Sequence, residues 1–305
     1  MQKKYIGRFV MLILLISVAI FVNSCASSRF ASRSSYEEPE IEYQPKGRLE
    51  SVIYTPTNQN ISEKRMMVYL PESYDESGKS YPVIYVLHGA RENELSWIKH
   101  GEVLEIIDEL ATSSTDDPTG KEAGFARECI VVMPNMNNYK DDEDYGNGRV
   151  LSMGRSMLSV TGGMEGSFMH DVVGRIDSLY RTVPDREHRA ICGLSIGSMQ
   201  SLYICANNPD DFGYLGLFSP FSKNVRRHDF YNDRKEKFDA LFLGPNPPYC
   251  QIYVGTMDIL YNHEQTFTKE WQNRGYKFEL HEMLGIHDWP VWKAGLRGFS
   301  ASFLE

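Results

Sequence analysis

The sequence predicts an α/β fold, with a mostly parallel central sheet of about eight strands and helices on both faces. First, short apolar runs alternate with stretches whose apolar residues recur at helical spacing, from residue 48 to the C-terminus. Second, the first two extended segments alternate polar and apolar residues, which predicts an antiparallel pair ahead of the parallel strands. Third, the chain has 305 residues, 42% hydrophobic and 24% charged, which suits a globular domain with a sizeable core.

The predicted strands are short runs rich in β-branched and aromatic residues. They are Leu49–Tyr54, Arg65–Leu70, Val83–Leu87, Cys129–Met133, Ala190–Leu194, Tyr214–Phe218, Gln251–Val254 and Lys277–Met283. The predicted helices are Gly101–Leu110, Phe168–Tyr180, Ser198–Asn207, Lys235–Leu243, Glu264–Arg274 and Trp292–Phe303. No internal repeat is visible, so we expect one domain over residues 48–305.

The first 24 residues have the pattern of an export signal. Three basic residues precede Phe9–Val22, an almost wholly apolar stretch that is short for a transmembrane span. The stretch ends in VNSC, which resembles a bacterial lipobox with Cys25 as the lipidated residue. We therefore expect residues 1–24 to be removed and the protein to be exported and anchored by lipid in the bacterial cell envelope, at the outer membrane, on its periplasmic face or at the cell surface. An ordinary signal peptide with a chance cysteine, or an uncleaved anchor, is the alternative.

Residues 25–47 are rich in Ser, Arg and Glu, which is typical of a flexible tether. The formal charge of the whole chain is −9, from 41 acidic and 32 basic residues, without a long run of Lys or Arg. This charge argues against nucleic acid as a partner. The acidic run at 141–144 lacks EF-hand spacing, so we expect a solvated loop and not a calcium site.

A G-x-S-x-G motif, Gly193 to Gly197, lies between a predicted strand and a predicted helix. A serine at such a sharp turn projects its Oγ above the sheet, and the glycines allow strand and helix to approach closely. The helix N-terminus also favours developing negative charge. Ser195 is therefore the candidate nucleophile, and the alternative is a glycine-rich turn with a capping serine.

A serine hydroxyl needs a neighbouring base, and in this type of fold the partners follow in the order Ser, acid, His. Asp258 follows the strand that ends at Val254, and His287 follows the last predicted strand, so both lie on the rim that carries Ser195. Asp288 competes with Asp258 as the acid, but its adjacency to His287 makes a good hydrogen bond to the same ring awkward.

The other histidines have weaker claims to a catalytic role. His88 also follows a strand and precedes a glycine, and His170 lies where it could face the site. His281 lies within the last strand, where we expect a structural role. Four more lie in polar contexts typical of the surface: His100, His188, His228 and His263.

The tetrahedral intermediate of acyl transfer needs two preorganised hydrogen-bond donors. The backbone N–H of Ile196, directly after the nucleophile, is the expected first donor. The second is expected from the loop after Val83–Leu87, which contains His88, Gly89 and Ala90.

Other catalytic motifs are incomplete. The S-x-x-K sequence at 96–99 lacks a later K-T-G, and the two His-Glu pairs, at 263 and 281, lack the second histidine of H-E-x-x-H. A penicillin-recognising enzyme and a zinc protease are therefore disfavoured, and we expect no metal or organic cofactor.

With these residues placed, the chain resembles the esterase D / feruloyl esterase family of α/β-hydrolases, carbohydrate esterase family 1, over about residues 48–303. The landmarks are Val68-Tyr69-Leu70-Pro71, Tyr81-Pro82-Val83, His88-Gly89, Trp97, Asp185-Arg186-Glu187-His188-Arg189-Ala190, Gly255-Thr256, His287-Asp288-Trp289 and Trp292. The resemblance implies an α/β-hydrolase fold. It implies Ser195, Asp258 and His287 as the triad, and the amides of Ala90 and Ile196 as the oxyanion hole. Ser198 departs from the second glycine that the family often has there, which we expect to alter packing behind the serine.

These features predict a secreted, lipid-anchored serine esterase acting on acetyl or feruloyl-type esters of polysaccharides or oligosaccharides. We expect His88, Trp97 and Trp289 to contact the substrate. A thioester or siderophore-type ester hydrolase of the same family is one alternative. A non-catalytic glycan-binding lipoprotein is another, with Trp97, Tyr139, Tyr145 and Trp289 stacking on sugars, but the complete triad argues against it.

The chain has five cysteines, an odd number for an exported protein. Lipidation of Cys25 would account for one, leaving Cys129, Cys192, Cys205 and Cys250. Their positions, in or beside predicted central strands and in one helix, favour buried free thiols, although an oxidising compartment permits disulfides.

Overall fold

The computed structural model describes residues 40–57, 63–112, 128–137, 164–220 and 235–304, all within one compact unit, Pro39–Glu305. Several residues considered above lie outside the described ranges: the signal segment, Cys25, most of the predicted tether, Tyr139, the acidic run, Tyr145 and His228. In the part of the chain that is described, no helix combines the length and apolar character needed to cross a membrane.

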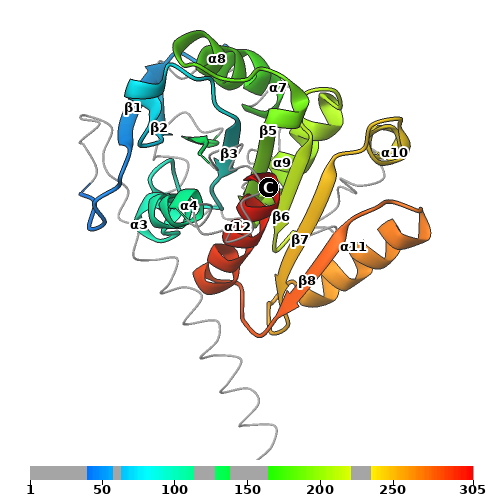
Figure 1. The fold of residues 1–305 in the computed structure, drawn as a ribbon. Helices are drawn as coiled ribbons and strands as arrows, with labels where there is room; N and C mark the ends of the chain where they lie inside the picture. Colours follow the sequence, from blue (N-terminus) through cyan, green and yellow to red (C-terminus); the bar gives the residue numbers. More distant parts are fainter. Residues whose placement is uncertain (1–39, 58–62, 113–127, 138–163, 221–234, 305) are drawn as a thin grey trace, which may run out of the picture. The chain divides into compact units, whose positions relative to one another are not determined.

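Eight strands form one sheet in these described residues (Figure 1). They are β1 (Arg48–Tyr54), β2 (Lys64–Leu70), β3 (Val83–Leu87), β4 (Ile130–Pro134), β5 (Arg189–Leu194), β6 (Tyr214–Phe218), β7 (Tyr249–Gly255) and β8 (Glu279–Met283). Their spatial order is β1-β2-β4-β3-β5-β6-β7-β8. The pairs β1–β2 and β2–β4 are antiparallel, and β3, β4, β5, β6, β7 and β8 pair in parallel. The predicted sheet, with its antiparallel start, is confirmed.

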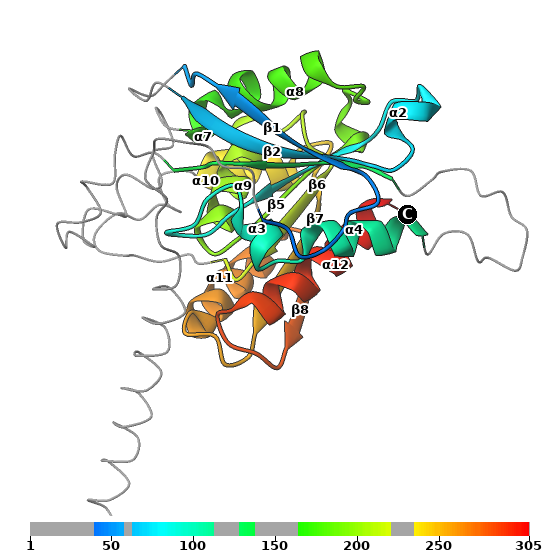
Figure 2. The ribbon, with the colours of Figure 1, turned by 90° about the vertical axis from the view of Figure 1, so that its left-hand side faces the viewer.

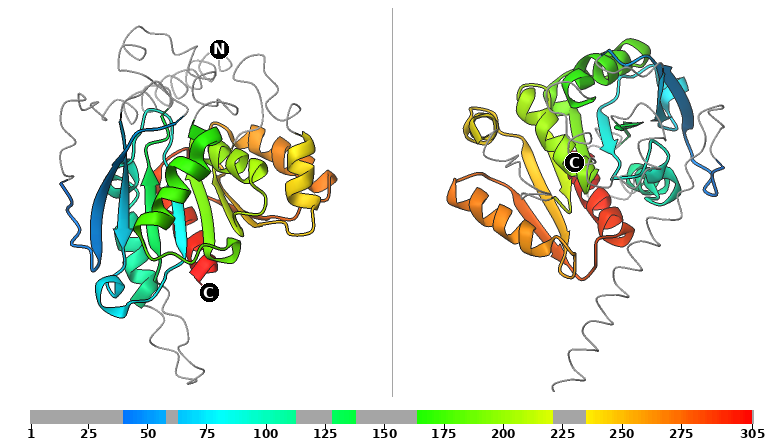
Figure 3. Two further views of the ribbon diagram at one scale, coloured as in Figure 1. Left: turned by 90° about the horizontal axis from the view of Figure 1, so that it is seen from above. Right: turned by 180° about the vertical axis from the view of Figure 1, so that it is seen from behind.

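Helices cover both faces of this sheet. They are α2 (Tyr74–Ser77), α3 (Ser96–Lys99), α4 (Val103–Thr112), α7 (Met164–Phe168), α8 (Gly174–Leu179), α9 (Ile196–Asn207), α10 (Lys235–Leu243), α11 (Tyr261–Asn273) and α12 (Trp289–Leu304), with a π-helical turn η2 (Met169–Val173) and a 3₁₀ turn η3 (Arg186–His188). Helix α9 packs on β3, β5 and β6, while α12 packs on β5, β6, β7 and α4. Figure 2 shows α8 on one side of the sheet and α4 with α12 on the other. Figure 3 shows β1 near one edge and α11 near the opposite edge.

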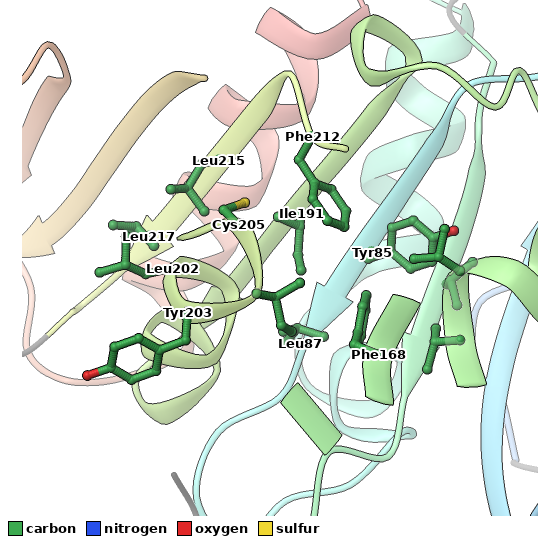
Figure 4. Packing of buried hydrophobic residues seen from close by; sticks show 14 of the residues in the cluster. Tyr85, Leu87, Phe168, Ile191, Leu202, Tyr203, Cys205, Phe212, Leu215 and Leu217 are labelled. Atoms are coloured by element: carbon green, nitrogen blue, oxygen red, sulfur yellow. The ribbon is translucent and has the colours of Figure 1, made fainter. Parts of the chain in front are cut away.

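Alternating residues of each strand supply two separate cores, as expected for a sheet buried on both faces. Leu87 and Ile191 belong to the core under α9, and their neighbours Val86 and Cys192 belong to the core under α4 and α12. Figure 4 shows part of the first core, where Leu202 and Cys205 of α9 lie beside Ile191, Leu215 and Leu217 of the sheet.

Five of the six predicted helices differ from their predicted bounds, including α4, which spans Val103–Thr112, and α9, which begins at Ile196. The helix predicted over Phe168–Tyr180 starts at Met164 and contains the π-helical turn η2, an irregularity that apolar spacing does not reveal. Helix α11 begins three residues before the predicted Glu264. Helix α12 begins at Trp289 and not Trp292, because Pro290 is tolerated in the first turn, where its missing N–H has no intrahelical partner.

Residues 40–47, which were expected to be part of the tether, contact the domain. The hydroxyl of Tyr43 and the backbone N–H of Lys46 both donate to Asp108 Oδ2 in α4, at 3.0 and 2.8 Å. Ile41 and Tyr43 pack against the core under α4 and α12. The ordered contacts therefore begin before residue 48.

Candidate active site

Ser195 occupies a strained turn between β5 and α9. Its φ and ψ of 51° and −114° are unusual for a residue with a side chain. Its backbone N–H donates to the carbonyl of Phe218 at the end of β6, at 2.8 Å. A Cβ on Gly193 would lie 2.6 Å from the backbone of Gly197, and a Cβ on Gly197 would lie 2.4 Å from the carbonyl oxygen of His88. Both glycines of the motif are therefore required by close backbone approach.

Three side chains from separate loops form a hydrogen-bonded chain at the C-terminal rim of the sheet. His287 Nε2 lies 3.0 Å from Ser195 Oγ, and His287 Nδ1 lies 2.7 Å from Asp258 Oδ2. The carboxylate accepts the Nδ1 proton, which leaves Nε2 free to accept the serine proton. The structure thus brings together the three residues that the sequence singled out. Asp258, and not Asp288, contacts the ring.

The loops that carry the acid and the base are tied to each other. The backbone N–H groups of Thr256 and Met257 donate to Met283 and Gly285, at 2.8 and 2.9 Å. Asp258 Oδ1 accepts the N–H of Leu260 at 2.8 Å, which leaves Oδ2 for the imidazole. Because the Asp258 side chain is fully buried, its charge is poorly screened by water.

The amides of Ile196 and Ala90 are the predicted donors to a developing oxyanion. Ile196 is the first residue of α9, so its N–H has no intrahelical acceptor. Within the described residues, neither amide donates a hydrogen bond. The close approach of Gly197 to the His88 carbonyl holds the loop that carries Ala90 against the start of α9. The oxyanion-hole roles of Ala90 and Ile196 stay predictions.

Comparison with known proteins shows the family of the chain. A family model described as "Putative esterase" matches residues 58–303. The chain belongs to this family. It is 33% identical over 156 residues to an endo-1,4-beta-xylanase/feruloyl esterase from Xylanibacter ruminicola, a match that covers 50% of this chain and 19% of that protein. This chain therefore corresponds to about a fifth of that relative.

Solved structures show the same fold. A carbohydrate esterase 1 ferulic acid esterase from Anaeromyces mucronatus has a TM-score of 0.68 at 23% identity, covering 89% of this chain and 95% of that one. An S-formylglutathione hydrolase from Staphylococcus aureus has a TM-score of 0.63 at 16% identity, covering 88% and 100%. The chain therefore has an α/β-hydrolase fold and is similar to carboxylic ester hydrolases, among them feruloyl esterases.

Two residues of the esterase expected to contact substrate are buried supports instead. His88 is 2% exposed, with Nδ1 donating to the Gly89 carbonyl at 2.8 Å and Nε2 accepting the N–H of Met136 at 2.9 Å. Burial lowers the pKa of His88 to about 4, so the ring is neutral and has no free nitrogen. Trp97 is 1% exposed and donates to the Leu87 carbonyl at 3.0 Å. Both residues follow β3 in the sequence, but their positions in the chain do not show that their side chains face inward.

Trp289 remains a candidate substrate contact. It is half-buried at the start of α12, with its ring perpendicular to the rings of Trp97 and Trp292 at 5.2 and 5.4 Å. His170 is exposed and pairs with Asp171 at 2.9 Å. His281 stacks on Tyr253 at 4.3 Å within the sheet, in keeping with its predicted structural role.

A buried polar network behind the oxyanion loop was not predicted. Arg65 Nε donates to Glu94 Oε1 at 2.8 Å, and both side chains are about 5% exposed. Asn135 donates to the other oxygen of Glu94 at 2.8 Å, and Asn137 donates to the carbonyl of Glu92 at 2.9 Å. The network joins β2, the loop after β3 and the loop after β4. The only sign of this network in the sequence is the pair Lys64-Arg65 at the start of β2, a strand that is otherwise largely apolar.

Four cysteines of the esterase are buried free thiols, as their positions in the sequence favoured: Cys129, Cys192, Cys205 and Cys250. Burial raises the pKa of each thiol, which keeps it protonated and unreactive.

Proposed function

We propose that the protein is an exported, lipid-anchored serine esterase that removes acetyl or feruloyl-type acyl groups from polysaccharides or oligosaccharides. The observation that carries the proposal is the hydrogen-bonded chain from Ser195 through His287 to Asp258. A serine, a histidine and a buried carboxylate in this order activate the hydroxyl for attack on an ester carbonyl.

The first half-reaction forms an acyl-enzyme. His287 Nε2 takes the proton of Ser195 as Oγ bonds to the carbonyl carbon, and Asp258 stabilises the imidazolium. The amides of Ala90 and Ile196 stabilise the negative oxygen, and loss of one such donor typically costs about 3–4 kcal/mol of transition-state stabilisation. The carbon–oxygen bond to the sugar then breaks, and His287 gives its proton to the departing hydroxyl group.

The second half-reaction returns the serine. His287 takes a proton from water, whose oxygen bonds to the acyl carbon, and the bond to Ser195 Oγ breaks with return of the proton from His287. The products are the free acid and the deacylated sugar.

The acyl-glycan substrate is supported by the relatives and by the rim of the site. The Xylanibacter relative is a xylanase/feruloyl esterase, and the fungal enzyme has been solved with ferulic acid. The loops carrying Asp258 and His287 expose Met257, Ile259 and Leu284, at 57%, 60% and 84%. Such apolar surface beside the reacting groups favours an aromatic acyl group.

Export and the lipid anchor are supported by the sequence of residues 1–25. The basic residues, the apolar stretch and Cys25 together match a lipoprotein signal. An acyl-glycan substrate outside the cytoplasm is consistent with such a location.

A substrate panel tests the proposal. The mature protein and its Ser195→Ala variant are assayed with p-nitrophenyl acetate, methyl ferulate, acetylated xylan, a ferric siderophore ester and a thioester. We expect hydrolysis of the first three, with kcat/KM lower by at least about 10⁴-fold in the variant. Hydrolysis of only the thioester or the siderophore would overturn the substrate class. Full activity of Ser195→Ala would overturn the site.

A further inference from the structure

Ser219 has a strained backbone that the mechanism above does not use. It directly follows β6, its φ is 50°, and it is fully buried. A non-glycine residue in this left-handed region is held there by its surroundings and often marks a functional position. Its backbone N–H donates to the carbonyl of Tyr253 in β7 at 2.8 Å, which fixes the turn.

The hydroxyl of Ser219 is aimed at an indole that contacts the catalytic histidine. Ser219 Oγ accepts the Nε1–H of Trp292 at 3.0 Å. Trp292, 6% exposed in α12, lies with its ring perpendicular to that of His287, at an interplanar angle of 87° and a centroid distance of 5.0 Å. The hydrogen bond leaves the indole little freedom to tilt, and the indole in turn restricts the imidazole.

The same corner also holds the nucleophile. The carbonyl of Phe218, the residue before Ser219, accepts the backbone N–H of Ser195 at 2.8 Å. The end of β6 is therefore connected to the nucleophile through its main chain and to the base through Ser219 and Trp292. The turn at the end of β6 therefore contacts Ser195 directly and His287 through Trp292, although these two residues follow different strands.

We propose that Ser219 and Trp292 are positioning residues that hold the imidazole of His287 in line with Ser195 Oγ, and that the left-handed backbone of Ser219 exists to aim its hydroxyl at the indole. The inference rests on the proposed esterase mechanism. Asp258 holds Nδ1 of the imidazole by one hydrogen bond, which by itself does not fix the tilt of the ring. The perpendicular indole supplies the missing restraint, because a small misalignment of reacting groups lowers the rate strongly.

Ser219→Gly and Trp292→Phe test the pair. Glycine adopts positive φ without strain, so Ser219→Gly removes the hydroxyl and keeps the turn. Phenylalanine keeps a ring and removes the N–H. We expect each variant to lower kcat for p-nitrophenyl acetate by about 10-fold, with KM changed less than twofold. The double variant should be no slower than the slower single variant, because both changes remove one shared hydrogen bond.

Matched controls separate positioning from loss of stability. Within the described residues, the hydroxyl of buried Ser300 and the indole nitrogen of buried Trp271 have no hydrogen-bond partner. Ser300→Ala and Trp271→Phe should therefore leave kcat unchanged. As a second readout, we expect the downfield proton resonance of His287 Nδ1–H, assigned by its loss in His287→Ala, to broaden in Ser219→Gly and Trp292→Phe but not in the controls.

The outcomes distinguish this inference from the proposed function. If Ser195→Ala is inactive while both pair variants keep wild-type kcat and a sharp Nδ1–H resonance, the positioning role is overturned and the esterase mechanism stands. If Ser195→Ala stays fully active, the mechanism fails and the positioning role fails with it. If either pair variant does not fold, the other variant decides.

Discussion

At the scale of single residues, the structure shows why the turn around Ser195 needs glycine at two positions. Gly193 and Gly197 are needed because any side chain would collide with neighbouring backbone, as the G-x-S-x-G motif indicated. The departure at Ser198 is accommodated: its buried Oγ donates to the carbonyl of Ser195 at 2.5 Å. Ser198 thus adds a hydrogen bond to the backbone of the nucleophile, at a position where the family often has a glycine.

His88 gives a prediction for pH dependence. Burial lowers the pKa of His88 from the usual 6.5 to about 4. Between pH 4 and pH 6.5 the ring is therefore neutral in the folded protein and takes up a proton when the protein unfolds. Stability is therefore lost as the pH falls from 6.5 toward 4. Urea unfolding should show wild type losing about 2 kcal/mol more than His88→Gln between pH 7 and pH 5.

The comparison between wild type and His88→Gln isolates this group. Burial raises the pKa of Glu92 to about 7, so this carboxyl makes the free energy of unfolding rise as the pH falls below 7. Both proteins contain Glu92, so its contribution cancels in the comparison. Equal pH dependence in the two proteins would show that His88 is protonated in the folded state.

At the scale of secondary-structure elements, the sequence predicts most of the fold because periodicity reports which face of each element is buried. All eight strands and their antiparallel start follow from alternation and apolar runs. The π-helical turn at Met169–Val173 and the Arg65–Glu94 pair could not be predicted. Both depend on contacts between residues distant in the chain, such as Thr57 with Asp171.

In the candidate site too, some features could be predicted from the sequence and others could not. Ser195, Asp258 and His287 could be predicted because each lies in the turn or loop that follows a strand and belongs to a local motif. The roles of His88 and Trp97 as buried supports could not, because their orientation depends on Met136 and on the Leu87 carbonyl. Residue type and position in a loop do not determine which way a side chain points.

The network behind the oxyanion loop should be sensitive to loss of one charge. Glu94→Gln removes the carboxylate charge that faces the buried Arg65 guanidinium, and breaking a buried ion pair typically costs about 3–5 kcal/mol. We expect a loss of that size in urea unfolding and a lower kcat, since the loop carries Ala90. The matched control is Glu109→Gln, which breaks the half-exposed Arg297–Glu109 pair and should cost less than about 1 kcal/mol. Similar small losses in both variants would mean that the buried pair does not support the loop.

At the scale of the whole molecule, the N-terminal segment with the pattern of an export signal differs in charge from the rest of the chain. The acidic domain follows an N-terminal stretch that contributes three of the 32 basic residues. Cleavage before Cys25 would leave a mature chain of charge −12. We propose that this chain is attached to the envelope by lipid alone.

Cys25→Ser tests the anchor. In a bacterial host that processes lipoproteins, wild type should sediment with the membrane fraction and incorporate labelled palmitate, and Cys25→Ser should do neither. Ser24→Ala, which keeps the cysteine and places a small residue before it, should behave as wild type. Membrane association of Cys25→Ser equal to that of wild type would contradict lipid anchoring.

The central claim is that Ser195 is the nucleophile activated by His287 and Asp258. Reaction with a fluorophosphonate, followed by intact-mass measurement and peptide mapping, tests it most directly. We predict one adduct per chain, located on the peptide containing Ser195, with labelling at least about 10²-fold slower in His287→Ala because the base is lost. An adduct on another residue, or undiminished labelling in Ser195→Ala, would contradict the account.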